Sequence, residues 1–479
     1  MLADRYAGEM RRAHTVEQVR AAEQPLLDTQ PSGALMARAA TGLAVAVVEE
    51  LRRRRGRTYG TRVVVLAGPG NNGGDALHAA ARLARRGVAV RAVALGEVLH
   101  PEGLAAFLTA GGRVVGLDEA VRFGPDLVLD GIVGIGGSPG LRPDAEAALE
   151  ALADVPVVAV DLPSGVDVDL GETPRSHVRA ALTVTFGTHK VATLVDPAAR
   201  ACGRVRLVDI GLDLPAPAVE ALEADDVARL LPVPSATAHK YTRGVVGVRA
   251  GSSTYPGAAL LCVAGAASGI AGMVRYVGPQ SVETQVRTRF PEVVGPGRVQ
   301  AWAVGSGSDT DAVTMLREAL ADDVPVVVDA DALAHLPRRG SSPRPGLVLT
   351  PHAGELAALV GEPRADVEAA PLRHAREVAQ HWQAVVLLKG ARTLVVHPDG
   401  RVRVNTTGTP WLATAGAGDV LTGLVASLLA SGLDPFDAAS VGAWLHGEAG
   451  ERAAACGTVV ATTIAGHLPG IIRAVTARV

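Results

Sequence analysis

Short apolar runs alternate with longer amphipathic stretches along most of the chain. In the first half, runs rich in valine and leucine predict strands over 62–67, 88–94, 126–130, 155–160 and 181–186. Apolar residues at helical spacing predict helices over 14–55, 76–86 and 144–152. Apolar strands that alternate with helices are typical of a parallel sheet covered on both faces, so this half is predicted to have an α/β fold.

The second half repeats this pattern after a change of texture. Five prolines or serines and an acidic patch punctuate the segment 213–238, which favours an interdomain linker containing some helix. Strands are then predicted over 244–248, 300–304, 324–329, 346–350 and 384–388, helices over 309–321 and 371–382, and a loop over 338–345. We therefore expect two separately complete α/β domains, 1–213 and 239–479, joined by a linker over 214–238.

Composition narrows the function classes. The 479 residues are 48% hydrophobic and 20% charged, which indicates a large core, and the net charge of −3 with 3% aromatic residues argues against nucleic acid as a partner. The three cysteines fit neither a disulfide framework nor a metal cluster, and no apolar leader or membrane span is predicted. These features favour the cytoplasm. Only three residues are lysines, and each lies close to a motif: Lys190, Lys240 and Lys389.

Three motifs in the first half follow predicted strands: GPGNNGGD at 68–75, DGIVGIG at 130–136 and DLPSGVD at 161–167. The carboxyl ends of parallel strands meet at one edge of a sheet, where ligands bind, and glycines let the backbone approach a phosphate closely. Asn72, Asp130 and Ser164 offer hard oxygen ligands for a cation, and Asp161 can act as an acid or a base. The plainer alternative is a strand-to-helix turn with capping aspartates.

With TVTFGTHK at 183–190, these motifs make residues 14–213 resemble the NAD(P)H-hydrate epimerase domain. The resemblance implies a Rossmann-like three-layer αβα fold, Asp161 as the proton carrier, and potassium at Asn72, Asp130 and Ser164. It places the hydrated dinucleotide at Asn71, Asn72, Gly73, Gly74, Asp75, Gly134, Ile135, Gly136, Gly137, Ser138, Pro139, Gly140 and Asp161.

The second half contains ATAGAGD at 413–419, directly before an apolar run. A Gly-Ala-Gly-Asp turn that opens a helix leaves backbone N–H groups free for an anion, and Asp419 can accept a proton from an attacking hydroxyl. This arrangement suits phosphoryl transfer, although a tight turn before a buried helix explains the turn equally well. DADAL, TPHAGE and LLKGART also follow predicted strands, which adds carboxylates that could hold Mg²⁺ and a lysine and an arginine for phosphates.

The order of these motifs over 225–479 resembles the ADP-dependent NAD(P)H-hydrate dehydratases of the ribokinase-like superfamily, with Asp309 in place of the last glycine of their GPGLG motif. The resemblance implies a ribokinase-like αβα domain that uses Mg²⁺ and ADP as co-substrate, with Asp419 as catalytic base, and a homo-oligomer. It places the hydrated dinucleotide at Ala258, Gly307, His352 and Asp419, and ADP or AMP at Lys389, Gly390, Ala391, Arg392, Thr393 and Gly418.

Together, the two resemblances predict an enzyme that epimerises the R and S hydrates of NADH and NADPH and dehydrates the S form. The alternative is a ribokinase-like kinase of hydroxymethylpyrimidine or a sugar, because the GAGD turn fits it equally. Its N-terminal half would then be a non-catalytic ligand- or protein-binding module. A stable phosphorylated product would favour the kinase.

Overall fold

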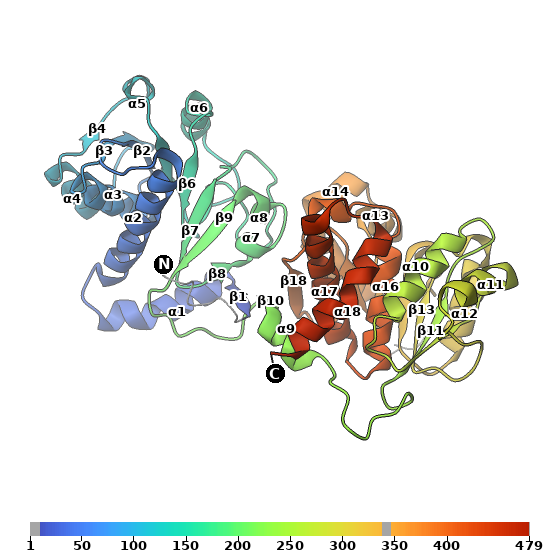
Figure 1. The fold of residues 1–479 in the computed structure, drawn as a ribbon. Coiled ribbons are helices and arrows are strands. Elements are labelled where there is room, and N and C mark those ends of the chain that lie inside the picture. The colour runs from blue at the N-terminus through green and yellow to red at the C-terminus, as the bar shows by residue number, and fades with distance from the viewer. Residues whose placement is uncertain (1–9, 338–345, 479) are drawn as a thin grey trace. The chain divides into compact units, whose positions relative to one another are not determined.

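The computed structural model describes residues 10–337 and 346–478, so the loop predicted over 338–345 lies outside the described residues. The chain divides into two compact units, Arg12–Val219 and a second unit that runs from Glu220 onward and includes Arg11. Each has its own sheet and core (Figure 1). The α/β class and the three-layer architecture predicted for both halves are confirmed.

The first unit is built on a sheet with the strand order β4-β3-β2-β5-β6-β7-β9, in which every pairing is parallel. Its strands are β2 (Arg62–Ala67), β3 (Ala89–Ala94), β4 (Arg113–Val114), β5 (Leu127–Gly131), β6 (Val157–Val160), β7 (Leu182–Phe186) and β9 (Arg204–Val208). Outside this seven-stranded sheet, β1 (Arg11–His14) pairs in parallel with β8 (His189–Lys190).

Helices cover both faces of this sheet. They are α1 (Val16–Thr29), α2 (Ala34–Arg55), α3 (Asn71–Ala84), α4 (Pro101–Thr109), α5 (Leu117–Phe123), α6 (Pro143–Ala151), α7 (Val191–Leu194) and α8 (Ala198–Ala201). Alternate strand residues divide between two cores: Val63 and Val65 pack with α2 and α3, whereas Val64 and Leu66 pack with α5 and α6. Strands buried on both faces explain the continuous apolar runs in the sequence.

Helix α3 begins at Asn71, five residues before the predicted start at Ala76, so the NNGGD motif forms its first turns. Both glycines of the motif are buried because the backbone is crowded there. A Cβ on Gly73 would lie 2.1 Å from the carbonyl oxygen of Gly68, and one on Gly74 would lie 2.8 Å from the His100 ring. The prediction was wrong because paired glycines usually mark a turn, whereas here they permit close packing.

The second unit has the strand order β12-β11-β13-β14-β15-β16-β17-β18-β10. The strands are β10 (Val219–Ala221), β11 (Val245–Arg249), β12 (Met273–Tyr276), β13 (Ala301–Val304), β14 (Val326–Val328), β15 (Leu347–Leu349), β16 (Val385–Leu388), β17 (Thr393–Val396) and β18 (Val402–Asn405). From β12 to β16 the pairings are parallel, but β16, β17 and β18 pair antiparallel. The sheet is therefore mixed, which the sequence pattern did not predict.

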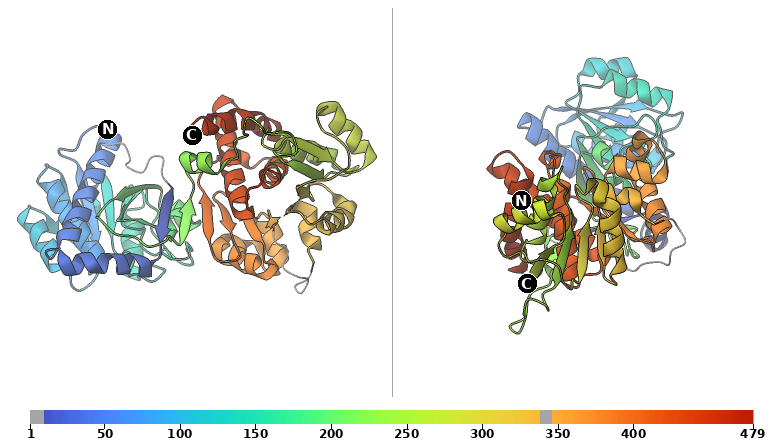
Figure 2. Two further views of the ribbon diagram at one scale, coloured as in Figure 1. Left: turned by 90° about the horizontal axis from the view of Figure 1, so that it is seen from below. Right: turned by 90° about the vertical axis from the view of Figure 1, so that its right-hand side faces the viewer.

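Helices also cover both faces of the second sheet, as the two views in Figure 2 show for each unit. They are α9 (Ala224–Leu230), α10 (Pro256–Ala266), α11 (Gln280–Arg289), α12 (Ala312–Ala321), α13 (Ala353–Val360), α14 (Arg364–Ala369), α15 (Pro371–Trp382), α16 (Ala417–Ala430), α17 (Pro435–Cys456) and α18 (Ala461–Thr476), with 3₁₀ turns at Asp309–Asp311, Ala330–His335 and Pro410–Leu412. The main core joins α10, α16, α17 and α18 to the sheet.

Among the described helices, none is by itself long and apolar enough to cross a membrane, although two bent helix pairs, α1 with α2 and α17 with α18, reach the required length and composition together.

Candidate active sites

A cavity of about 740 Å³ opens at the carboxyl ends of β2, β5 and β6 in the first unit. Most residues predicted to bind the hydrated dinucleotide line it together, namely Asn71, Asn72, Asp75, Gly134, Ile135, Gly136, Gly137, Ser138, Pro139, Gly140 and Asp161. Gly73 and Gly74 do not line it, because they are buried inside α3. The cavity is also lined by Arg20, Glu23, Arg142, Arg175 and Lys190, for which no role at this site was predicted.

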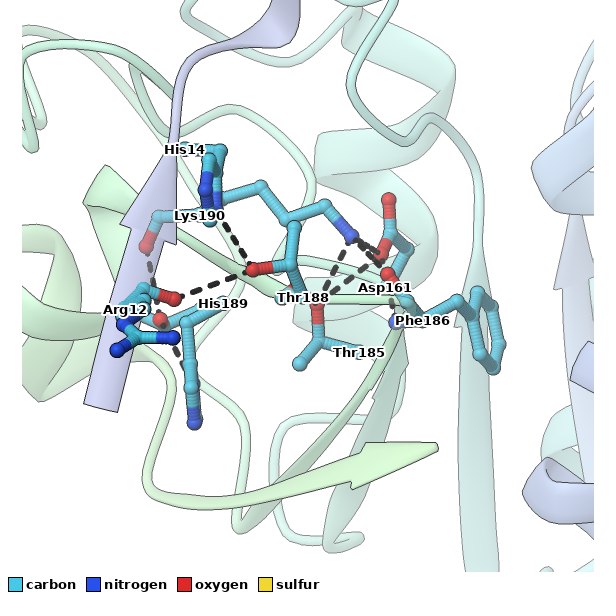
Figure 3. Close-up of polar contacts among 9 residues, drawn as sticks. Arg12, His14, Asp161, Thr185, Phe186, Thr188, His189 and Lys190 are labelled. Atoms are coloured by element: carbon cyan, nitrogen blue, oxygen red, sulfur yellow. Dashed lines mark hydrogen bonds and ion pairs between the residues drawn. The ribbon is translucent and has the colours of Figure 1, made fainter. Parts of the chain in front are cut away.

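Asp161 and Lys190 form a buried ion pair in this cavity (Figure 3). The Lys190 ammonium lies 2.5 Å from Oδ1 of Asp161 and also donates to the Thr185 hydroxyl and the Phe186 carbonyl oxygen. All three ammonium protons therefore have acceptors. Asp161 adopts a φ of 64°, which is strained for a residue other than glycine, so the surrounding contacts hold its carboxylate in a fixed position.

Two further carboxyl groups approach Asp161 in the cavity. Burial raises the pKa of Asp75 well above its usual range, and the negative charges of Asp161 and Glu23 raise it further. Oδ1 of Asp75 is buried and has no hydrogen-bond partner among the described residues. Burial likewise raises the pKa of Glu23. The cavity thus combines a carboxylate paired with an ammonium and a carboxyl group that favours its protonated form, which suits proton transfer in both directions.

Of the residues predicted to bind potassium, Asp130 and Ser164 lie at the ends of β5 and β6, and Asn72 lies in the first turn of α3. The Ser164 hydroxyl donates to Oδ1 of Asp130 at 2.6 Å, and the Ser164 N–H donates to Oδ2 at 2.8 Å. A Cβ on Gly134 would lie 3.0 Å from the amide oxygen of Asn72, so this oxygen lies beside the loop that follows β5. Asp130 is fully buried, and burial raises its pKa to about 6, because none of its described partners is a cation. These oxygen donors fit a bound monovalent cation.

In the second unit, Lys389 connects the ends of three strands to the GAGD turn. Its ammonium lies 2.7 Å from Oδ1 of Asp329, which follows β14, and 3.7 Å from a carboxylate oxygen of Glu355. A Cβ on Gly418 would lie 3.3 Å from the same ammonium. Lys389 therefore places a positive charge beside the N-terminus of α16, where an anion is already favoured.

Asp329 holds this lysine. Burial alone would raise the pKa of Asp329, but the Lys389 ammonium and a hydrogen bond from Thr350 at 2.9 Å together lower it. Its second oxygen accepts a hydrogen bond from the Ser306 hydroxyl at 3.2 Å. Asp329 therefore forms an ion pair with Lys389, and the binding of Mg²⁺ by carboxylates of the DADAL motif stays a prediction. The described residues contain no His, Cys, Asp and Glu cluster that could hold a metal by itself.

Asp419 lies in the first turn of α16, as predicted. Burial raises its pKa to about 7, and the nearby negative charge of Asp329 contributes, whereas a hydrogen bond with Ser306 and the charge of Lys389 oppose the rise. A carboxylate whose pKa lies near neutrality is well suited to accept and return a proton at that pH. The GAGD motif therefore combines a base and an anion-binding helix end.

The other predicted residues fall around this centre. Gly307 and Ala258 are in direct contact, since a Cβ on Gly307 would lie 2.6 Å from that of Ala258. His352 caps the N-terminus of α13, and its backbone forms an isolated parallel β-bridge with that of Lys389. Gly390, Ala391 and Arg392 form the turn from β16 to β17, and Thr393 begins β17. The buried His446 donates from Nε2 to the Ala417 carbonyl oxygen at 2.9 Å, and burial lowers its pKa to about 4, so a neutral imidazole fixes the start of α16.

The sequence also missed several residues that support these sites, namely Ser306, Thr350, His446, Glu23 and Arg20. Thr350 opens the TPHAGE motif, but its contact with Asp329 was not foreseen. Ser306 and His446 contact residues 23 and 29 positions away, which no local pattern indicates. The lysines gave a usable signal, because two of the three in this arginine-rich chain hold carboxylates at the two sites.

Two family models match the chain. Residues 246–470 match the model described as NAD(P)H-hydrate dehydratase, and residues 32–192 match the YjeF-related protein N-terminus. Curated relatives match across both units. The chain is 49% identical over 447 residues to the bifunctional NAD(P)H-hydrate repair enzyme Nnr of Mycobacterium tuberculosis, which covers 90% of this chain and 92% of the relative. The corresponding protein of Moorella thermoacetica is 36% identical over 458 residues, 85% of this chain and 86% of the relative.

Among solved structures, the ADP/ATP-dependent NAD(P)H-hydrate dehydratase of Bacillus subtilis, co-crystallised with ATP and Mg²⁺, is 30% identical with a TM-score of 0.50. The match covers 53% of this chain and 98% of that one. A ribokinase-like superfamily protein of Enterococcus faecalis, 24% identical with a TM-score of 0.50, covers 55% of this chain and 98% of that one, and it shows the fold.

The fold defines a two-domain α/β protein with a Rossmann-like first domain and a second domain that shares the fold of the Bacillus subtilis dehydratase and of the ribokinase-like protein. The chain belongs to the family of bifunctional NAD(P)H-hydrate repair enzymes.

Proposed function

We propose that this chain restores hydrated NADH and NADPH, with its first domain interconverting the R and S hydrates and its second dehydrating the S form with ADP. The observation that carries this proposal is that each unit of one chain holds a lysine–carboxylate pair beside the residues predicted for its site. Family membership over both units supports the same assignment. The predicted boundaries, 1–213 for the epimerase and 239–479 for the dehydratase, are part of the proposal.

In the epimerase domain, Asp161 and Asp75 are proposed to exchange protons with the substrate. One carboxyl group protonates the departing hydroxyl, which leaves as water, and the other takes a proton from the water that returns on the opposite face. Asn71, Asn72 and the loop 134–140 line the space for the dinucleotide. Asn72, Asp130 and Ser164 would hold K⁺, whose charge would stabilise the buried Asp130 carboxylate and keep the two loops together.

In the dehydratase domain, Asp419 is proposed to take the hydroxyl proton of the S hydrate as that oxygen attacks the terminal phosphorus of ADP. The bond to AMP breaks, and the developing charge faces Lys389 and the N–H groups at the start of α16. Loss of phosphate and of a ring proton then restores the double bond. Ala258, Gly307 and His352 are proposed to contact the hydrate, and Gly390, Ala391, Arg392, Thr393 and Gly418 the nucleotide.

We propose that Mg²⁺ is bound mainly by the nucleotide and not by a set of protein carboxylates, because Asp329 is paired with Lys389. An ion held mainly by phosphates and water fits this site. The use of ADP rather than ATP, a homo-oligomeric state and a cytoplasmic location also stay predictions. No specific observation favours the small-molecule kinase, and membership of the repair-enzyme family argues against it.

The proposal is tested by incubating the purified chain with S-enriched NADPH hydrate, Mg²⁺ and either ADP or ATP, and following the absorbance band of the reduced nicotinamide. We expect restoration with ADP, together with AMP and orthophosphate in equal amounts. The variant Asp419→Ala should abolish it. A stable phosphorylated product, or no restoration with either nucleotide, would overturn the dehydratase assignment.

A further inference from the structure

The charged side chains that line the cavity of the first domain fall into a buried group and an exposed group. Its carboxyl groups and its lysine are buried or half-buried: Glu23, Asp75, Asp161 and Lys190. Its three arginines are all exposed: Arg20, Arg142 and Arg175. A ligand that fills this space meets groups able to transfer protons at one end and guanidinium groups at the other.

Two of these arginines lie against the glycine-rich loop 134–140. A Cβ on Gly136 would lie 3.4 Å from Nη2 of Arg20, and a Cβ on Gly140 would lie 3.0 Å from Cδ of Arg175. The glycines at these positions therefore leave room for both side chains to cross the loop. Arg20 comes from α1 and Arg175 from the segment after β6, so elements distant in sequence bring both to one loop.

Arg20 and Arg175 are also available for a ligand. In the part of the chain that the structure describes, neither guanidinium has a hydrogen bond or an ion pair, and only the charge of Glu23 lies near Arg20. Arg142 differs, because it donates to the Leu95 carbonyl oxygen at 2.6 Å and lies 3.6 Å from Asp144. Exposed guanidinium groups without a protein partner bind phosphate strongly, with two parallel hydrogen bonds.

We propose that Arg20 and Arg175 form a phosphate-binding rim of the epimerase cavity that favours hydrated NADPH over hydrated NADH. The rim holds the phosphate groups while the hydrated ring lies among the buried carboxyl groups. The third phosphate of NADPH adds about two negative charges at neutral pH, which gives the rim a basis for discrimination. This inference rests on the proposed epimerase function.

The test compares Michaelis constants for the R hydrates of NADPH and NADH in the double variant Arg20→Ala/Arg175→Ala. An excess of the Asp161→Asn chain, with ADP and Mg²⁺, removes the S form as it appears, so the epimerase of the tested chain limits the rate. Arg57→Ala, an exposed arginine of the same domain that does not line the cavity, is the matched control. Arg20→Lys/Arg175→Lys keeps the charge but loses the paired hydrogen bonds.

We expect the double alanine variant to raise KM for the NADPH hydrate about tenfold and that for the NADH hydrate clearly less, with kcat retained. The lysine variant should fall between it and the wild type, and the contrast should shrink at high salt. Unchanged constants, or equal increases for the two hydrates, would overturn the proposal. If adding the wild-type chain does not convert the R hydrate faster than the Asp161→Asn chain does alone, the proposed epimerase function itself is wrong.

Discussion

At the scale of single residues, both sites use a lysine to hold a carboxylate at the end of a parallel strand. Lys190 pairs with Asp161 at 2.5 Å after β6, and Lys389 pairs with Asp329 at 2.7 Å after β14. In each case a second carboxyl group nearby has a raised pKa, Asp75 in the first domain and Asp419 in the second. Each site therefore has one carboxylate fixed by charge and one group that can change its protonation state.

The pKa of Asp419 predicts how dehydratase activity depends on pH. The base must be deprotonated, and burial has raised its pKa to about 7, so kcat should rise with pH through a midpoint near 7 and level off at higher pH. Removing the negative charge in Asp329→Asn should shift this midpoint downward, because that charge contributes to the raised value. The check is the pH profile of kcat for both chains. A flat wild-type profile between pH 5 and 8 would contradict Asp419 as the base.

Replacing Lys190 should damage only the epimerase. In Lys190→Met the Asp161 carboxylate stays buried without its partner, which typically costs about 3–5 kcal/mol of unfolding free energy. We expect loss of R-hydrate conversion with retained S-hydrate conversion, measured in one assay, and a lower midpoint of chemical unfolding. Lys240→Met removes an exposed lysine and is the control. Equal effects of the two substitutions would contradict the structural role of the ion pair.

At the scale of elements, glycines allow α10 and α16 to pack closely against each other. The GAGD turn lies at the start of α16. A Cβ on Gly423 would lie 1.9 Å from the Cys262 carbonyl oxygen, and one on Gly265 would lie 2.0 Å from that of Val420. Gly423→Ala should therefore destabilise the chain by about 1–3 kcal/mol. Gly466→Ala, on an open face of α18, should stabilise it by about 0.5–1 kcal/mol. Denaturant unfolding of both variants checks these opposite signs, and effects of equal sign would contradict the packing account.

Glu50 joins α2 to β9 in the first domain. Hydrogen bonds from Arg53 lower its pKa to about 2, and Arg54 and Arg204 contribute, although burial opposes them. A lowered pKa stabilises the fold above the unfolded value of about 4.5, and this contribution disappears as pH falls toward 2. Glu50→Gln should cost about 1–3 kcal/mol at pH 7 and nothing near pH 2.

The neighbouring Glu49 offers a matched control. It pairs with Arg206, but its side chain is 55% exposed, so Glu49→Gln should cost about 0–1 kcal/mol. Unfolding free energies measured at pH 7 and at low pH test the contrast. A pH-independent effect of Glu50→Gln would contradict the network.

The elements that the sequence predicted well are those with continuous apolar runs, such as β2 and β5, because burial on both faces leaves an unbroken signal. The start of α3 was wrong because Gly73 and Gly74 are helical for reasons of packing with Gly68 and His100. The antiparallel β16–β17–β18 arrangement was missed because strand direction depends on pairing partners rather than on local pattern.

At the scale of the whole molecule, the motifs gave the candidate site residues, and the structure gave their partners. Asp161 and Asp419 were identified from short motifs at strand and helix ends, but Lys190 as the partner of Asp161 lies 29 positions away. The DADAL motif offered carboxylates that could hold Mg²⁺, and the pairing of Asp329 with Lys389, 60 positions away, became visible only in the fold. Pairings of this kind depend on the order of strands in the sheet, which no local pattern encodes.

The central claim is that one chain performs two consecutive steps, and purified R hydrate of NADPH tests it most directly. With the full chain, ADP and Mg²⁺, the account predicts complete recovery of the reduced-nicotinamide absorbance. In Asp161→Asn, recovery from the R form should fall to the rate of spontaneous epimerisation, while recovery from the S form is unchanged. If the wild-type chain restores only the S hydrate, or if Asp161→Asn restores the R hydrate as fast as the wild type, the account of the first domain is wrong.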